Sequence, residues 1–235
     1  MYAPTFLMGD SRVRQLTPNV IPVIKTWCKP GAKVYDFYEI AEGELSDLIE
    51  AQDEMPLVYV SAGICNLTLR IKSNHRGSPI DEIIVPSGEA AINEQIDSTK
   101  EALDDLQRFI SRQGGLPILC TLYPMAIGDW NTVRLNQGKT TILSKADQYD
   151  DMQRTLEDMV EQVNASIIDL NRQNSTKTPL LNKALSHCRG NRRGPSYRYN
   201  LLCDGCHPTS KLNRDLAKSI TKTIAINSTV LRARD

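Results

Sequence analysis

Short apolar runs alternate with longer amphipathic stretches along the chain. Five runs are rich in strand-forming residues: 5–8 (TFLM), 33–38 (KVYDFY), 57–62 (LVYVSA), 116–122 (LPILCTL) and 166–170 (SIIDL). Continuous apolar runs of this length are typical of strands that are covered on both faces, as in parallel sheets. The pattern therefore predicts five buried strands.

Apolar residues recur at helical spacing between these runs. One stripe comprises Ile92, Ile96, Leu103, Leu106 and Ile110, a second Met152, Leu156, Met159, Val160 and Val163, and a third Leu212, Leu216, Ile220 and Ile224. Gly114 and Gly115 are a plausible stop for the first helix, and residues 44–51 are a shorter candidate. Alternation of strands and helices predicts a doubly wound α/β fold with right-handed crossovers. Without repeats or low-complexity segments, we expect one domain over residues 1–235.

Three stretches fit neither periodicity. Residues 74–87, 124–145 and 176–200 are loop-like in composition, with many Gly, Pro, Asn or Thr residues. Segments that leave the carboxyl ends of parallel strands line the ligand crevice of such folds. These stretches are therefore candidate substrate walls, and the alternative is that they are tolerated surface loops.

Composition narrows the classes of partner. The chain is 40% hydrophobic and 24% charged, and 28 basic residues balance 28 acidic ones. No net field therefore favours a nucleic acid or an acidic partner. No run approaches the roughly 18 apolar residues that span a bilayer, and the first residues lack the features of a signal peptide. We expect a cytoplasmic protein that binds no membrane, or a secreted one if a signal was removed from a precursor.

Ser11 is the first candidate for chemistry. The first apolar run leads directly into Gly9-Asp10-Ser11, which presents a serine at the carboxyl end of a strand. The tripeptide is common, and a serine or aspartate there can also cap a helix. A second feature is needed to distinguish a nucleophile from a turn.

Asp204 and His207 supply that feature near the other end of the chain. A serine hydroxyl needs a base within hydrogen-bond reach, and histidine, with a reference pKa of about 6.5, suits this role. An aspartate on the same loop can hold the imidazole in one tautomer. Pro208 biases His207 away from helical geometry, so the histidine is expected on a loop that enters the last helix.

Acyl transfer also requires donors for the developing oxyanion. Gly43 follows the second predicted strand, where a backbone N–H could face the site. Asn66 follows the third predicted strand in Gly63-Ile64-Cys65-Asn66, where a side-chain amide could donate. All these candidates fall at strand ends or on the loop before the last helix.

The order of these motifs resembles the SGNH (GDSL-type) hydrolase superfamily. The resemblance implies a three-layer α/β/α flavodoxin-like sandwich with a five-stranded parallel sheet, and hydrolysis or transfer of ester-linked acyl groups without a metal or cofactor. It implies that Ser11 is the nucleophile, His207 the general base and Asp204 its orienting partner. The N–H groups of Ser11 and Gly43 and the amide of Asn66 would form the oxyanion hole.

Two departures from the family pattern stand out. The third block is usually Gly-x-Asn-Asp, whereas two residues separate Gly63 from Asn66 here. The first block continues as Arg12-Val13-Arg14, which resembles the branch of O-acetyltransferase domains and PC-esterases. Arg12 and Arg14 either lie on a solvated helical turn or bind an anionic substrate group. Trp130 is either a substrate platform or a loop anchor.

We therefore expect a serine esterase that removes acetyl groups from a sugar or another small polar ester. An O-acyltransferase is one alternative, and a catalytically silent binding module on the same fold is another. A third alternative is a structural zinc site, for which the soft ligands would be His187, Cys188, Cys203, Cys206 and His207. For the six cysteines, free thiols are otherwise the default expectation.

Overall fold

The structure is a computed structural model that describes residues 2–14, 16, 22–75, 77–187 and 196–233. Its main sheet has four parallel strands within these residues, in the order β2-β1-β3-β6. They are β1 (Thr5–Gly9), β2 (Lys25–Cys28), β3 (Leu57–Ser61) and β6 (Leu116–Leu119). The chain runs from β1 to β2 in one direction and through β3 to β6 in the other. In open parallel sheets, such a reversal creates a crevice at the carboxyl ends of the two central strands, here β1 and β3.

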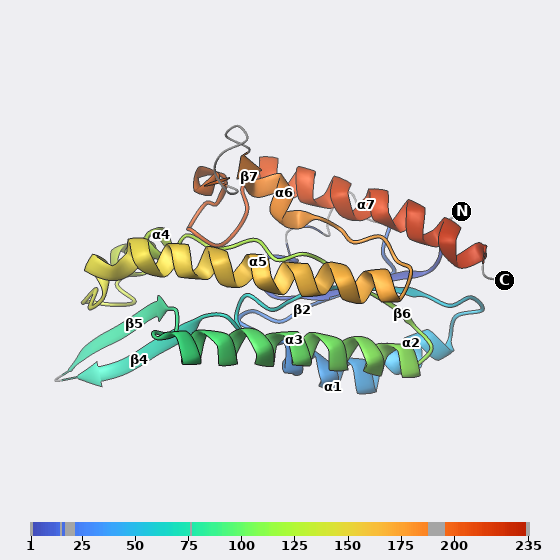
Figure 1. Cartoon of the computed structure of the whole chain (residues 1–235), viewed down its shortest axis with the longest axis horizontal. Coiled ribbons are helices and arrows are strands. Elements are labelled where there is room, and N and C mark those ends of the chain that lie inside the picture. Colours follow the sequence, from blue (N-terminus) through green and yellow to red (C-terminus); the bar gives the residue numbers. More distant parts are fainter. Residues whose placement is uncertain (1, 15, 17–21, 76, 188–195, 234–235) are drawn as a thin grey trace.

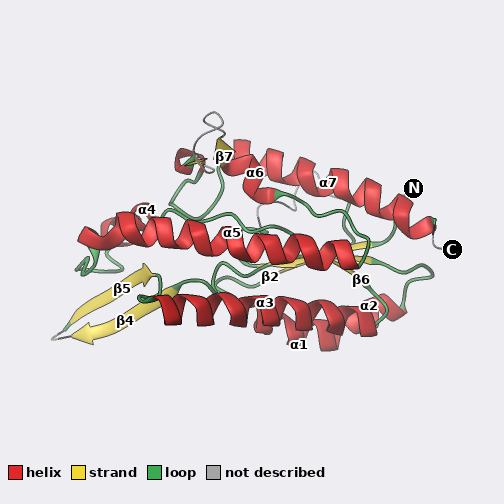
Figure 2. Cartoon of the chain, viewed as in Figure 1, coloured by secondary structure: helices red, strands yellow, loops and turns green. Residues whose placement is uncertain are grey.

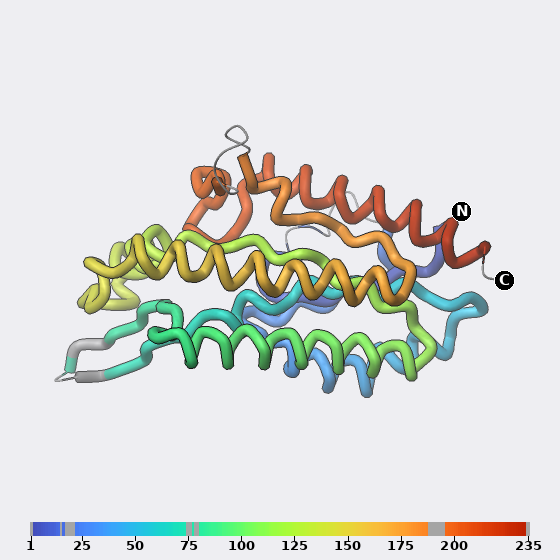
Figure 3. The backbone as a smooth tube through the Cα atoms, viewed as in Figure 1, coloured from blue at the N-terminus to red at the C-terminus, as the bar shows by residue number. Residues whose placement is uncertain are grey.

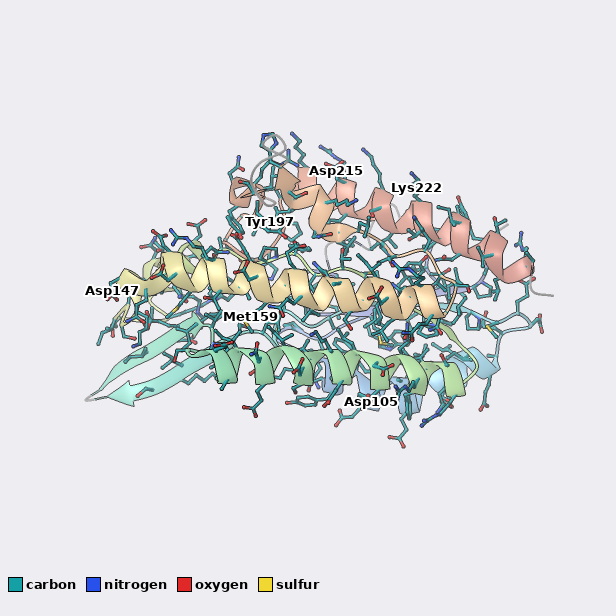
Figure 4. The ribbon with its side chains drawn as sticks, in the orientation of Figure 1. Asp105, Asp147, Met159, Tyr197, Asp215 and Lys222 are labelled. Carbon is teal, nitrogen blue, oxygen red and sulfur yellow. The ribbon has the colours of Figure 1, made fainter. Side chains whose placement is uncertain are left out.

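Helices cover both faces of this sheet (Figures 1 and 2). The principal ones are α3 (Glu89–Arg112), α5 (Tyr149–Gln173), α6 (Leu181–Leu185) and α7 (Ser210–Arg232). Alternate strand residues point to opposite faces, so Phe6 and Met8 pack with α3 and α5 while Leu7 packs with α6 and α7. Met159 is fully buried on the inner side of α5, and Lys222 projects outward from α7 (Figure 4).

The three amphipathic helices predicted from the sequence are confirmed as α3, α5 and α7. After α3, Gly114 has a φ of 89°, a left-handed conformation that glycine adopts without steric cost and that often follows a helix. At the start of α7, the Thr209 side chain accepts a hydrogen bond from the Leu212 N–H. This cap ends the preceding loop, which carries His207, and begins the helix.

The strand predicted at residues 33–38 is wrong, because that segment is helical. It forms η1 (Val34–Phe37), which continues as α1 (Tyr38–Ile40), η2 (Ala41–Leu45) and α2 (Ser46–Glu50). Val34 and Phe37 are both buried, three positions apart, which is a helical and not a strand spacing. The Asp36 carboxylate also accepts the Lys33 N–H at 2.7 Å and caps the first turn. The second strand of the sheet is β2, earlier in the chain.

The predicted fifth strand at residues 166–170 is also wrong, because the segment lies inside α5. Two buried asparagines of α5 bind the backbone of the edge strand β6 and of the segment that follows it. Asn171 accepts the Leu119 N–H at 3.0 Å and donates to the Leu119 carbonyl at 2.7 Å. Asn164 makes the same pair with Leu122, at 2.6 and 2.9 Å. Seven helical residues and three extended residues both span about 10 Å, so the two spacings match.

All three loop-like stretches contain regular structure: the third includes α6, and the first two include elements that pack against each other. A hairpin of β4 (Leu69–His75) and β5 (Ser78–Ile84) leaves the sheet after β3, and α4 (Ile127–Asn136) follows β6. Asn131 of α4 accepts the Ile83 N–H and donates to the Ile83 carbonyl, both at 2.8 Å. Hairpin and helix therefore form one unit, which lies at one end of the molecule (Figure 3). We name β4, β5 and α4 together the hairpin–helix arm.

The remaining described elements are short. They are η3 (Ala146–Gln148), β7 (Ser186–His187), β8 (Ser196–Tyr197) and η5 (Tyr199–Leu201). Strands β7 and β8 pair antiparallel with each other. None of the described helices has the length and apolar character needed to cross a bilayer.

Candidate active site

Ser11 follows β1 in a tight turn that only glycine permits. An added Cβ at Gly9, the last residue of β1, would lie 2.3 Å from Val13 Cγ2 and 2.5 Å from the Ser61 carbonyl oxygen. This close approach lets the Asp10 N–H donate to the Ser61 carbonyl at 3.3 Å. The partly exposed Ser11 therefore stands at the crevice between β1 and β3.

Arg12 is buried beneath this turn, with 3% of its surface exposed. Its Nη2 lies 2.8 Å from Asp10 Oδ2, its Nε donates to Asp10 Oδ1 at 3.0 Å, and its Nη1 donates to the Tyr123 carbonyl at 2.9 Å. Burial by itself lowers the pKa of Arg12, but the Asp10 carboxylate outweighs it and the pKa is raised. Neither interpretation of Arg12, as a solvated residue or as a ligand for an anionic substrate group, fits this position. The side chain is buried, and protein groups bind its guanidinium. Arg12 instead ties the Ser11 turn to the segment after β6.

His207 connects Ser11 to Asp204 through two hydrogen bonds. Its Nδ1 lies 2.6 Å from Asp204 Oδ2, and its Nε2 lies 2.9 Å from Ser11 Oγ. An ionised carboxylate can only accept, so the Nδ1 proton of a neutral His207 faces Asp204. In this tautomer Nε2 is free to accept the hydroxyl proton of Ser11. The three predicted residues are thus brought together in the order that nucleophilic catalysis requires.

Asp204 remains ionised because its hydrogen bonds outweigh its burial. Burial raises the pKa of a carboxyl group, but the His207 imidazole and the N–H groups of His207 and Cys206 lower it to about 2. Those backbone groups donate to Asp204 Oδ1 at 2.7 and 3.0 Å. One carboxylate oxygen of Asp204 therefore stabilises the loop that carries it, and the other orients the imidazole of His207.

Gly205 docks the histidine loop onto the start of α4. Its φ is +79°, and an added Cβ would lie 2.5 Å from the Trp130 nitrogen and 2.6 Å from the Ala126 carbonyl oxygen. The Ala126 N–H donates to the Gly205 carbonyl at 2.6 Å. These contacts fix the loop between Asp204 and His207 relative to the hairpin–helix arm.

Gln153 of α5 holds the other side of this junction, and the sequence reasoning missed it. Its Oε1 accepts the Ile127 N–H at 3.0 Å, and its Nε2 donates to the Met125 carbonyl at 3.0 Å and to the Tyr199 hydroxyl at 2.6 Å. Tyr199 opens η5, just before the histidine loop. One amide therefore positions both the residues around Ala126 and the entry to that loop. A single polar side chain on a helix carries no signal of this role in the sequence.

Comparison with known proteins rests on structure. The sequence matches no protein-family model and no curated protein. A GDSL-like lipase from Bacteroides thetaiotaomicron matches over 95% of this chain and 88% of its own, with a TM-score of 0.60 and 13% identity. An acetyl xylan esterase matches over 93% and 98%, with a TM-score of 0.54 and 16% identity. A protein from Slackia heliotrinireducens assigned as an SGNH hydrolase matches over 95% of this chain and 100% of its own, with a TM-score of 0.51 and 13% identity. The chain has the fold of the SGNH hydrolases.

Asn66, the predicted side-chain donor, lies in the turn that follows β3. Asn66 is 5% exposed, and its Oδ1 accepts the Val34 N–H at 2.9 Å. Because a backbone N–H can only donate, this bond identifies the oxygen and leaves Nδ2 as the donor end. The longer spacing from Gly63 is absorbed by a turn in which the Asn66 N–H donates to the Gly63 carbonyl at 3.0 Å, with Gly63 at a φ of +132°.

Gly43 does not follow a strand, although the sequence predicted that position for it. It lies within the helical segment η2. Residues 29–33 are the segment that follows β2. The placement predicted for Gly43 is wrong because it depended on the misassigned strand at residues 33–38.

Trp130 lies beside His207, whereas Arg14 lies on the turn that follows Ser11. Trp130 lies on α4, partly exposed, with its ring centroid 6.0 Å from that of His207. It therefore borders the hydrogen-bonded chain, and its backbone also anchors Gly205. Arg14 is exposed on the turn after Ser11, and contact with a substrate stays a prediction for it.

The alternative of a structural zinc site finds no ligand cluster among the described residues. They contain no group of three or more His, Cys, Asp or Glu side chains arranged to hold a metal, and Cys188 lies outside them. Both ring nitrogens of His207 are engaged with Asp204 and Ser11. Burial raises the pKa of Cys206 to about 12, which disfavours the thiolate that zinc binds. The five cysteines in the described residues are free thiols.

Proposed function

We propose that the chain is a serine esterase that hydrolyses acyl esters through Ser11, His207 and Asp204. The observation that carries the proposal is the pair of hydrogen bonds at His207, 2.6 Å to Asp204 and 2.9 Å to Ser11. The SGNH fold supports it, because the solved structures that share this fold include a GDSL-like lipase and an acetyl xylan esterase.

The reaction would proceed in two steps. Ser11 Oγ attacks the ester carbonyl carbon while His207 Nε2 removes the hydroxyl proton. The imidazolium then protonates the departing alcohol oxygen as the carbon–oxygen ester bond breaks, which leaves an acyl group on Ser11. Water then reacts in the same way. His207 takes a proton from the water molecule while the water oxygen attacks the acyl carbon. His207 passes this proton to Ser11 Oγ as the bond to the acyl group breaks and the carboxylic acid is released. Asp204 stays ionised throughout and stabilises the imidazolium.

Asn66 and Ser11 are the proposed donors to the oxyanion of each tetrahedral intermediate. Asn66 Nδ2 is the donor end of a side chain that the Val34 N–H already holds in place. The Ser11 N–H is the second proposed donor, because it belongs to the same residue as the nucleophile. Donors that are oriented before substrate binds stabilise developing charge without reorganisation.

An acetyl ester of a sugar or another small polar molecule is the proposed substrate. The solved acetyl xylan esterase with this fold makes a carbohydrate ester a reasonable substrate class. Trp130 supports it from this chain, because an indole beside the catalytic histidine offers an apolar face on which a sugar ring can stack. The same chemistry with an acceptor alcohol in place of water would make the chain an O-acyltransferase.

Labelling and hydrolysis together test the proposal. A fluorophosphonate probe should label the wild-type protein and not the Ser11→Ala variant, while Ser87→Ala, at an exposed serine outside the site, should be labelled normally. Hydrolysis of p-nitrophenyl acetate should fall by about three orders of magnitude or more in Ser11→Ala. Equal hydrolysis by both proteins, or no labelling of folded wild type, would instead favour a catalytically silent binding module.

A further inference from the structure

Arg134 stands on the same side of α4 as Trp130, one helical turn farther from His207. The Trp130 ring centroid is 6.0 Å from the His207 ring centroid and 6.0 Å from Arg134 Cζ. The four-residue spacing places the two side chains next to each other along the helix. An ester held at Ser11 with its alcohol half over Trp130 would therefore extend toward Arg134.

Arg134 carries charge that the protein does not fully neutralise. It forms an ion pair with Asp81 of β5, but Arg70 of β4 also binds this carboxylate, with Nη2 at 2.7 Å from Asp81 Oδ2. Two guanidinium groups thus share one carboxylate. Burial, followed by repulsion from Arg70, lowers the pKa of Arg134. The three side chains Arg134, Arg70 and Asp81 therefore carry a net charge of one positive unit.

Arg134 also has an unsatisfied donor. Its Nε is buried and has no hydrogen-bond partner within the described part of the chain. A buried donor without a partner is costly, and such groups in native structures call for an explanation. The Arg134 side chain is 15% exposed and the Arg70 side chain 48%, so neither arginine is sealed from solvent.

We propose that Arg134, together with Arg70, binds an anionic group on the alcohol half of the ester, so that the enzyme prefers substrates bearing a carboxylate or a similar oxyanion. The proposal rests on the proposed esterase function. Trp130 covers one ring of the alcohol half, and the arginines meet a negative charge on the far side of that ring. Guanidinium groups suit this role because they are permanently charged and match the geometry of an oxyanion.

A competing interpretation is that Arg134 and Asp81 only fasten the hairpin to α4. The two interpretations make different predictions for the substrate preference of Asp81→Asn. If Asp81 is only half of a fastening ion pair, its loss weakens the arm and lowers activity toward every ester. If the arginines bind an anion, loss of the carboxylate frees both of them and raises the preference for an anionic ester.

The test compares kcat/KM for 4-carboxyphenyl acetate with kcat/KM for phenyl acetate, which lacks the charge. Wild type should prefer the carboxylated ester, after correction for the intrinsic reactivities measured with hydroxide. The ratio should fall about threefold to tenfold in Arg134→Gln and in Arg70→Gln, and rise in Asp81→Asn, as expected for one partly screened charge pair. Arg108→Gln, which removes an exposed charge on α3, should keep the wild-type ratio.

Each remaining result decides between the interpretations. The preference of wild type should also decrease as salt is raised from low to physiological concentration. A corrected wild-type ratio of one, or a ratio unchanged in both arginine variants, would overturn the proposal. If Arg134→Gln does not fold, Arg70→Gln and the salt dependence still test it. Absence of hydrolysis of both esters by wild type would instead contradict the esterase function itself.

Discussion

His207 Nε2 lies 2.9 Å from Ser11 Oγ, although the two residues are 196 positions apart in the chain. Each is held by its own set of contacts. Close packing at Gly9 and the buried Arg12 fix the turn of Ser11. Gly205, docked on α4, fixes the loop of His207. Because contacts within the protein hold both residues in place without a substrate, the proposed nucleophile and its base are preorganised.

Asp204→Asn should lower kcat by about three to four orders of magnitude while the protein remains folded. Asn can keep one oxygen for the N–H groups of Cys206 and His207, so the loop is retained. Its NH2 group would then face His207 Nδ1 and favour the tautomer with the proton on Nε2. That tautomer cannot accept the proton of Ser11. Steady-state kinetics on p-nitrophenyl acetate measure the loss, and a kcat within tenfold of wild type would contradict this role for Asp204.

Asp204 should also contribute to stability in acid. Its pKa is about 2 in the folded protein and 3.8 as the reference value. A group with a depressed folded pKa stabilises the protein above its unfolded pKa, and this contribution is lost as the pH falls through the folded value. The contribution, about 1 kcal/mol after discounting for its partial exposure, should therefore decline between about pH 4 and pH 2.

Urea unfolding of wild type and Asp204→Asn at several pH values measures this contribution. The difference in the free energy of unfolding between the two proteins should shrink as the pH falls from 5 toward 2.5. A difference that stays constant over this range would show that the carboxylate is not stabilised by its folded surroundings.

Asn66→Asp separates the two ends of the Asn66 side chain. The aspartate keeps an oxygen that can accept the Val34 N–H, but it removes the Nδ2 donor. If Nδ2 stabilises the oxyanion, kcat should fall about 100- to 1000-fold or more, because the new charge also repels the oxyanion. KM should change little. Asn66→Ala should show a similar loss of kcat with a lower melting temperature, because it also leaves the Val34 N–H unpaired.

A kcat of Asn66→Asp within a few-fold of wild type would remove Asn66 from the oxyanion hole. A matched control is Asn93→Asp, at an exposed asparagine of α3. It introduces the same change of charge away from the crevice and should leave both kcat and KM at their wild-type values.

The sequence predicted correctly those helices and strands whose conformation is determined by the local pattern of apolar and polar residues. The amphipathic stripes of α3, α5 and α7 are confirmed, because one apolar face of a long helix must be buried whatever covers it. The strands β1, β3 and β6 are confirmed for a similar reason, as short apolar runs buried on both faces. The positions of Ser11 and His207 followed from the strand end and the helix start beside them.

The errors arose where tertiary contacts decide the local structure. Residues 166–170 have the composition of a strand, but their helix places Asn164 and Asn171 against the edge of β6, where a fifth strand would otherwise bind. The placement of Gly43 failed with the strand before it. Arg12 has the charge of a surface residue, and its burial depends on the Asp10 carboxylate together with the distant Tyr123 carbonyl. The contacts of Asn164, Asn171 and Tyr123 join segments that are far apart in the chain, so nearby sequence does not encode them.

Gly205→Ala should reduce kcat/KM at least tenfold, whereas Gly138→Ala should leave it at the wild-type value. Both glycines have positive φ angles, +79° and +66°, so alanine strains the backbone at each position by about 1 kcal/mol. Only at Gly205 would the new Cβ also meet backbone, at 2.5 Å from the Trp130 nitrogen, whereas nothing lies within 4 Å at Gly138. The loop of His207 must therefore move away from α4, which lengthens the bond to Ser11. Kinetics and thermal unfolding of both variants separate the two effects: a loss of activity at Gly205 alone, in a variant that is still folded at the assay temperature, would establish that docking on α4 positions the base. Full activity in a folded Gly205→Ala variant would show that the loop holds His207 without α4.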